Sequence, residues 1–201
     1  MEITAPMVKE LREKTGAGMM DCKAALKESG GDIDKAVDIM RTKGLADLAK
    51  KASRATNEGL VGSYIHAGGR IGVLVQVNCE TDFVARNEEF QAFVKDIAMH
   101  IAASNPSWRS RDEVPEDVVS HEMGIYKAQA AESGKPENIQ EKIAEGRMDK
   151  FYKEVCLLEQ PFVKNPDLTV EQLMGEIVSK LGENMNVERF ERFEVGTAGS
   201  C

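Results

Sequence analysis

The sequence contains no run of about 18 apolar residues, the length that crosses a membrane, so we expect no membrane-spanning helix. Its N-terminus has no basic segment followed by an apolar one, so we expect no signal peptide. Cysteine is scarce: Cys22, Cys79, Cys156 and Cys201 lie far apart, and none belongs to a Cys-x-x-Cys pair. We therefore expect neither a zinc site nor a cofactor, and free thiols favour a reduced, cytoplasmic protein. Cys201 is expected on an exposed tail.

Basic charge is also scarce. The 201 residues include 26 lysines and arginines against 34 aspartates and glutamates, for a formal net charge of -8. A general nucleic-acid binder needs a basic surface that neutralises phosphates, so we expect no direct nucleic-acid binding. Lys50, Lys51 and Arg54 leave a local RNA contact open as an alternative. These three residues are few and have no aromatic residue among them, which favours a solvated helical linker over residues 46–58.

Residues 4–44 predict three short helices. Thr4 can cap the first helix, and a glycine-containing turn then ends it. Asp32 is placed to cap the third helix, and we expect Gly44 to end it.

Met19 and Met20 follow the glycine turn at residues 15–18. Two interpretations are open. The pair can fill the core of the small bundle, or it can form an adaptable binding surface, since methionine is flexible and polarisable.

The most informative stretch is residues 78–87. Alternating apolar side chains over residues 71–77 predict a strand with one buried face. Asn87 stands at the N-cap position of an amphipathic helix that we expect over residues 88–103. The segment between them is therefore a strand-to-helix corner, which can hold a small projection rigidly.

Thr81, Asp82 and Phe83 occupy this corner. One interpretation is structural: Phe83 turns back into the core and Asp82 caps the helix. The other is that the corner presents these side chains to a partner.

The rest of the chain predicts an α+β fold. Residues 60–66 and 70–78 predict a β-hairpin across a Gly-Gly turn, and residues 184–195 predict a last strand that completes a three-stranded antiparallel sheet. Residues 115–160 predict an antiparallel helical hairpin. The predicted domains are a three-helix N-terminal module, the basic helical linker and a core, at residues 1–45, 46–58 and 59–201.

Several motifs resemble one known family. Residues 11–26 and 79–87 are similar, in that order, to the two signatures of bacterial translation elongation factor Ts. The similarity extends to residues 62–66, 133–136 and 144–148. The resemblance implies a guanine nucleotide exchange factor for the GTPase elongation factor Tu, which is not an enzyme of covalent chemistry. It also implies that the N-terminal module is similar to the ubiquitin-associated fold, and that the chain is the short form with a single core unit.

The resemblance implies a role for the corner. In the family, this loop reaches toward the magnesium and phosphate region of the GTPase. The residues at the matching positions, which would dislocate the partner's magnesium, are Thr81, Asp82, Phe83 and Val84.

The resemblance also implies a second set of contacts. By position, Arg12, Met19 and Met20 would pack against a helix of the GTPase domain. His66 lies in the segment similar to another contact loop of the family, although a histidine beside a hairpin turn can also be an ordinary surface residue.

Phe83 and His66 flank opposite ends of one predicted strand, which spans roughly 30 Å. One copy is therefore not expected to place both on one site, and we predict a homodimer in which the two residues come from different subunits. The alternative is a monomer that uses the Phe83 corner alone. The helical hairpin and the last strand offer apolar surface for the contact, through Val187, Phe193 and Val195.

Two other classes of protein compete with this interpretation. An enzyme would need a catalytic pair such as Asp82 with His66 or His121, but no Ser-His-Asp or Cys-His arrangement and no Gly-x-x-x-x-Gly-Lys motif is evident. A ubiquitin-associated-type adaptor would use the three-helix module and leave Phe83 without a function.

Overall fold

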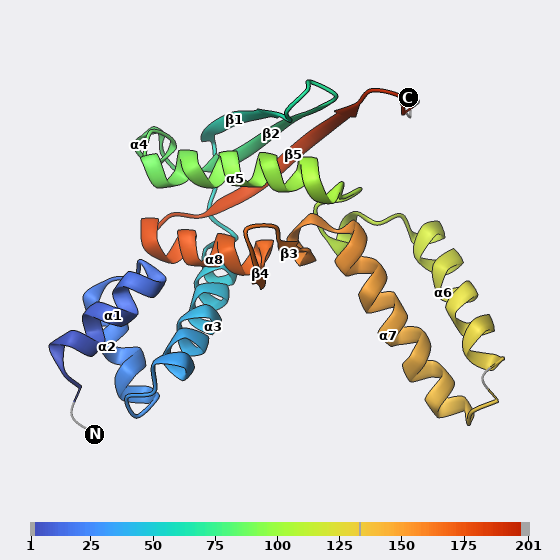
Figure 1. Cartoon of the computed structure of the whole chain (residues 1–201), viewed down its shortest axis with the longest axis horizontal. Helices are drawn as coiled ribbons and strands as arrows, with labels where there is room; N and C mark the ends of the chain where they lie inside the picture. The colour runs from blue at the N-terminus through green and yellow to red at the C-terminus, as the bar shows by residue number, and fades with distance from the viewer. Residues whose placement is uncertain (1–2, 133, 198–201) are drawn as a thin grey trace. The chain divides into compact units, whose positions relative to one another are not determined.

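The computed structural model describes residues 3–132 and 134–197, so Cys201 lies outside the described residues. The fold is α+β, as predicted, and forms two compact units, one of residues 1–102 with 171–201 and one of residues 103–170 (Figure 1). The elements of the first unit are α1 (Ala5–Thr15), α2 (Met19–Glu28), α3 (Ile33–Lys51), β1 (Glu58–Ile65), β2 (Ile71–Cys79), α4 (Asp82–Ala85), α5 (Glu88–Ser104), α8 (Val170–Leu181) and β5 (Met185–Glu194). No helix of the described chain is long and apolar enough to cross a membrane.

Helices α1, α2 and α3 form the predicted three-helix module around a small core of buried side chains, which includes Leu11 and Leu26. Gly16 ends α1 in the left-handed conformation, with φ of 67°, which glycine adopts without a steric penalty. Asp32 caps α3 as predicted, because its carboxylate accepts a hydrogen bond from the Lys35 N–H at 3.1 Å. Thr4 occupies the N-cap position of α1, but its side chain makes no capping hydrogen bond there.

The predicted end of the third helix at Gly44 is wrong, because α3 continues to Lys51. Gly44 is buried, and a Cβ placed on it would lie 3.1 Å from the carbonyl carbon of Gly175 in α8. The glycine thus allows two helix backbones to approach closely. The division into residues 1–45, 46–58 and 59–201 stays a prediction, and the first part of that linker continues α3.

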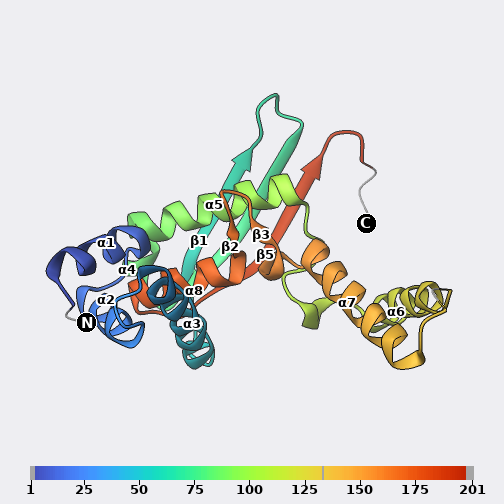
Figure 2. The same ribbon diagram turned by 60° about the horizontal axis from the view of Figure 1, so that its bottom comes forward.

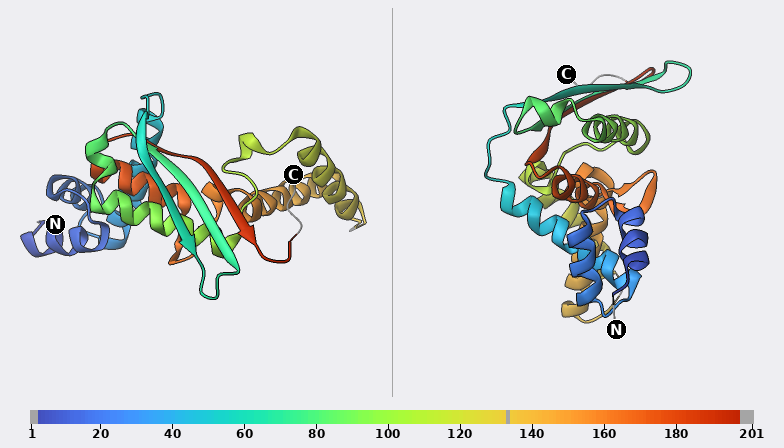
Figure 3. Two further views of the ribbon diagram at one scale, coloured as in Figure 1. Left: turned by 90° about the horizontal axis from the view of Figure 1, so that it is seen from above. Right: turned by 90° about the vertical axis from the view of Figure 1, so that its left-hand side faces the viewer.

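The three-stranded sheet has the order β1-β2-β5 and is antiparallel throughout, as predicted (Figure 2). Helix α5 runs along one face of the sheet (Figure 3). The inward side chains of β2 are buried there, and Gly62 of β1 leaves room for Val94 of α5, since a Cβ on it would lie 2.4 Å from the valine methyl. The helix and sheet therefore form one hydrophobic core.

The opposite face of the sheet carries exposed apolar side chains. Val61 and Leu74 lie on this face with Phe193, whose side chain is 63% exposed, and within the described part of its unit no helix covers them. Val187 is an exception to the predicted apolar contact surface, because it is buried in the core on the other side.

The second unit contains the predicted helical hairpin, formed by α6 and α7. Helix α7 ends at Val155, earlier than predicted. Its buried seam residues are Ala144 and Met148, whereas Ile139, expected in the seam, is exposed and Ile143 is only partly buried. The short two-stranded sheet that follows was not predicted. The elements of this unit are the 3-10 helices η1 (Arg111–Glu113) and η2 (Leu157–Glu159), the helices α6 (Glu116–Ala131) and α7 (Glu137–Val155), and the strands β3 (Pro161–Phe162) and β4 (Asn165–Thr169).

Candidate functional site

The strand-to-helix corner presents one large apolar side chain to solvent. Strand β2 ends at Cys79, the single helical turn α4 follows, and α5 begins at Glu88. Phe83 on this turn is 80% exposed, which rules out the interpretation that its ring belongs to the core. Val84, its neighbour, is 4% exposed and anchors the turn in the core, so its place among the residues that would dislocate the partner's magnesium stays a prediction.

Thr81 caps the turn that carries Phe83. Its hydroxyl oxygen accepts a hydrogen bond from the Val84 N–H at 3.4 Å, and its carbonyl accepts one from the Ala85 N–H at 3.2 Å. Thr81 itself has extended backbone dihedrals, as an N-cap residue should. The structural interpretation, in which Asp82 caps the helix, is therefore wrong, since Thr81 caps α4 and Asn87 accepts the Glu89 N–H at the start of α5.

The thiol of Cys79 supports the corner from inside. The side chain is fully buried, and its S–H donates a hydrogen bond to the Thr81 carbonyl at 3.2 Å. Burial, and to a smaller extent the nearby Glu183 carboxylate, raise the pKa of this thiol to about 11. Cys79 therefore stays protonated at neutral pH, acting as a hydrogen-bond donor and not as a reactive thiolate.

Asp82 lies beside Phe83 on the same exposed turn. Its carboxylate forms an ion pair with Arg86 at 2.9 Å, one helical turn further on. Both side chains are largely exposed, so this pair contributes little to folding stability and leaves both charges accessible to a partner.

The loop between α8 and β5 holds the corner from a distant part of the sequence. Glu183 accepts two hydrogen bonds from Thr81, from the backbone N–H at 3.0 Å and from the hydroxyl at 2.7 Å. The corner also binds this loop through a carboxylate of its own, since Glu80 accepts a hydrogen bond from the Asn184 N–H at 2.6 Å. That bond, together with the ion pair to Arg54, holds the pKa of Glu80 below its ordinary value.

The N-terminal candidate residues gather around the turn between α1 and α2. Met19 is 60% exposed and Met20 is 77% exposed, so the interpretation as core filler is wrong for both. Arg12 is also exposed, on the last turn of α1. The following residue of α2, Asp21, bonds to Lys43 of α3 at 2.5 Å, and this hydrogen bond raises the pKa of the lysine.

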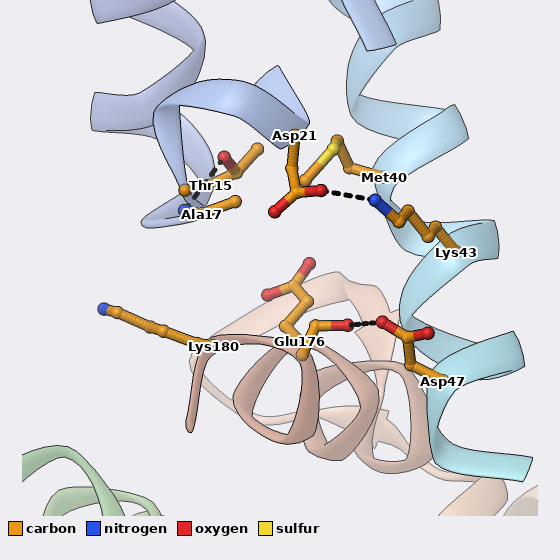
Figure 4. A pocket seen from close by; sticks show the side chains of 10 residues that line it. Thr15, Ala17, Asp21, Met40, Lys43, Asp47, Glu176 and Lys180 are labelled. Carbon is orange, nitrogen blue, oxygen red and sulfur yellow. Dashed lines mark hydrogen bonds and ion pairs between the residues drawn. The ribbon is translucent and has the colours of Figure 1, made fainter. Parts of the chain in front are cut away.

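A cavity of about 70 Å³ separates this turn from helix α8 (Figure 4). Asp21 and Lys43 line one side, and Glu176 reaches in from α8 on the other. Ser179 of α8 donates a hydrogen bond to Asp47 of α3 at 2.8 Å, which joins the module to the core beside the cavity. Burial raises the pKa of the Glu176 carboxyl, although the positive charge of Arg41 acts in the opposite direction.

His66 lies at the other end of the sheet from the corner. The register pairs Glu58 with Cys79 near the corner and Ile65 with Gly72 near the hairpin turn. His66 is exposed, and its Nδ1 lies 3.1 Å from the Tyr64 hydroxyl. The structure therefore does not bring His66 together with Phe83 within one chain.

The same separation removes the candidate catalytic pair of Asp82 with His66. His121, the other histidine considered, lies on α6 in the second unit. Among residues 3–132 and 134–197, no three His, Cys, Asp or Glu side chains gather so that they could hold a metal ion. The first unit presents a set of exposed apolar side chains to solvent, among them Phe83, Met19 and Met20.

Exposed apolar side chains on an α+β fold are typical of the class of proteins that bind other macromolecules. The comparison with known proteins agrees with this class. The family model described as elongation factor TS matches residues 8–197, and the chain belongs to this family of translation elongation factors.

Relatives named elongation factor Ts are similar over almost their whole length. The protein from Geobacter sulfurreducens is 64% identical over 196 residues, which cover 98% of this chain and 91% of the relative. That from Carboxydothermus hydrogenoformans is 61% identical over 96% of this chain and 89% of its own length. The protein from Acetivibrio thermocellus is 62% identical over 96% of this chain and 90% of its own length.

The residues that hold the corner in place were not predicted in that role. Glu183, Asn184 and Arg54 carry no motif, and Glu183 lies 102 residues from the threonine that it binds. A hydrogen bond at that separation leaves no local pattern in the sequence.

Proposed function

We propose that this chain is a guanine nucleotide exchange factor for elongation factor Tu. It binds the GDP-loaded GTPase, disturbs the magnesium and phosphate site of that partner, and releases GDP so that GTP can bind. Family membership supports this proposal, and the observation that carries it is the exposed ring of Phe83 on a clamped turn.

Exchange of this kind needs no covalent chemistry. The factor must bind the empty GTPase more tightly than the loaded one, and by linkage GDP weakens the binding of the factor equally. Shifting a GTPase from almost fully loaded to almost fully empty requires roughly 5.5 kcal/mol of differential binding.

Phe83 supplies part of this difference. Its ring enters the GTPase beside the nucleotide and moves groups that position magnesium, with the exposed Asp82 next to it, while Thr81 and the buried Val84 keep the turn in place. Loss of magnesium removes charge that neutralises the phosphates of GDP, and the nucleotide then dissociates.

The N-terminal module supplies affinity and orientation. Met19, Met20 and Arg12 form an exposed surface that mixes apolar area with one positive charge. Methionine side chains suit such a surface because they adapt to the partner at little energetic cost.

The test measures release of a fluorescent GDP from elongation factor Tu after addition of the chain and excess unlabelled GDP. We expect release to accelerate many-fold with rising concentration of the chain and then to saturate. Binding without acceleration would instead support the adaptor alternative, in which only the three-helix module is used.

We further propose that the working particle is a homodimer. The exposed apolar face of the sheet, with Val61, Leu74 and Phe193, offers area for a two-fold contact. A dimer would place Phe83 of one subunit and His66 of the other on one site, which we do not expect of a single chain because these residues lie at opposite ends of the β1–β2 hairpin.

A further inference from the structure

Glu183 binds Thr81 with both of its carboxylate oxygens. Oε2 accepts the backbone N–H of Thr81 at 3.0 Å, and Oε1 accepts the hydroxyl at 2.7 Å. Hydrogen bonds to a charged acceptor are stronger than neutral ones, and two from one residue also fix its orientation.

With Glu183 in place, every polar group of Thr81 has a partner. The N–H and hydroxyl donate to Glu183, the hydroxyl oxygen accepts from Val84, and the carbonyl accepts from Cys79 and Ala85. The dihedral angles of Thr81 are thereby fixed, and so is the direction in which α4 leaves the sheet. Since α4 is a single turn, it cannot hold its own direction without such support.

A second arm runs in the opposite direction between the same two segments. Glu80 accepts the Asn184 N–H at 2.6 Å, so each segment contributes a carboxylate that binds an N–H of the other. The Asn184 side chain then donates to the Arg54 carbonyl at 2.8 Å, just beyond the end of α3. Together, these contacts connect the corner with the segment at Arg54 that follows α3.

We propose that Glu183 is a positioning residue that acts through Thr81 to hold the Phe83 turn in the orientation that exchange requires. This inference rests on the proposed exchange function. Both carboxylate oxygens of Glu183 already accept hydrogen bonds from Thr81, so the proposed role needs no contact between Glu183 and the partner. Its effect should therefore appear in the rate of nucleotide release and not in the affinity for the GTPase.

The first measurement is a titration of GDP release with Glu183→Ala. We expect the maximal rate to fall by about tenfold, the scale of one hydrogen bond to a charged group, while the half-saturating concentration changes less than about threefold. Glu171→Ala, which removes the same charge from an exposed position on α8, is the matched control and should leave both values unchanged.

Conservative substitution separates positioning from general stability. Glu183→Gln keeps an oxygen that can accept the Thr81 N–H, so we expect it to recover part of the lost rate with a melting temperature close to that of the wild type. If the variants melt alike but release GDP at the wild-type maximal rate, the inference is wrong. A change confined to the half-saturating concentration would also overturn it.

Amide hydrogen exchange of the free chain tests the clamp without any partner. In Glu183→Ala we expect faster exchange at Val84 and Ala85, whose N–H groups bind Thr81, and unchanged exchange in β2 and α5. This readout separates two failures: a wild-type chain that does not accelerate GDP release refutes the proposed function, whereas unchanged amide exchange at α4 refutes the role of Glu183.

Discussion

Removal of the Phe83 ring separates its role in folding from its role in exchange. The side chain is 80% exposed, so folding covers only about one fifth of it. Full burial of a phenylalanine is worth about 1.5–3 kcal/mol, and Phe83→Ala should therefore lower the free energy of unfolding by only about 0.5 kcal/mol. Phe90, which is fully buried on α5, provides the contrast, since its truncation should cost about 3–5 kcal/mol.

The same area becomes available for binding the GTPase. If the ring is buried only when nucleotide is being released, its loss removes about 1.5–3 kcal/mol from that step, which corresponds to a maximal rate lower by about 10- to 150-fold. Phe83→Leu keeps much of the apolar volume and should retain more of the rate than Phe83→Ala.

The assay combines urea unfolding of the free chain with stopped-flow release of fluorescent GDP from elongation factor Tu. Two results would refute the reasoning. A loss of about 3 kcal/mol in stability would mark Phe83 as a core residue, and an unchanged maximal rate would show that the ring does not act on the nucleotide site.

Four further predictions concern other parts of the first unit. Replacing Met19 and Met20 with Asp should raise the half-saturating concentration for GDP release but leave the maximal rate intact, and unchanged activity at low concentration would contradict this. Light scattering at micromolar concentration should give a dimeric mass that Phe193→Asp reduces to that of a monomer; a monomeric wild type would refute the dimer. Because burial raises the pKa of Glu176, its negative charge lowers the stability of the folded chain at high pH, and Glu176→Gln should therefore raise the melting temperature at pH 8. The gain should vanish below pH 4.5, where the carboxyl is protonated in both the folded and the unfolded chain. Gly44→Ala should lower the free energy of unfolding, as measured in urea.

Local patterns predicted the corner and most of the elements, but not the extent of α3 and α7 or the β3–β4 sheet. The alternation in β2 and the capping position of Asn87 depend on residues close in sequence, and Asn87 does accept a hydrogen bond from the Glu89 N–H at 2.8 Å. The exposure of Phe83 could not be predicted this way, because either direction of the ring fits the same short motif. Family resemblance, and not periodicity, favoured the exposed interpretation.

The contacts that hold the corner could not be predicted from local sequence patterns, because they depend on strand pairing between distant segments. Glu183 and Thr81 meet only because β5 pairs with β2, which brings Met185 opposite Cys79. A glutamate after a helix is an ordinary surface residue in sequence, and its role depends on the register of strands that lie far apart in the chain.

Gly44 gives the sharpest contrast between a local rule and the packed structure. Glycine in a helix interior costs about 0.8–1.0 kcal/mol relative to alanine, so an isolated helix would gain from Gly44→Ala. In the protein, the added Cβ would lie 3.1 Å from a backbone carbon of Gly175, and moving α8 away costs about 1–3 kcal/mol as overpacking does elsewhere. We therefore expect Gly44→Ala to lower the free energy of unfolding by up to about 2 kcal/mol.

Gly146 in α7 is the matched control, because nothing lies within 4 Å of a Cβ placed there, and Gly146→Ala should stabilise by about 1 kcal/mol. Equal stabilisation by both substitutions would show that α3 and α8 do not need two facing glycines.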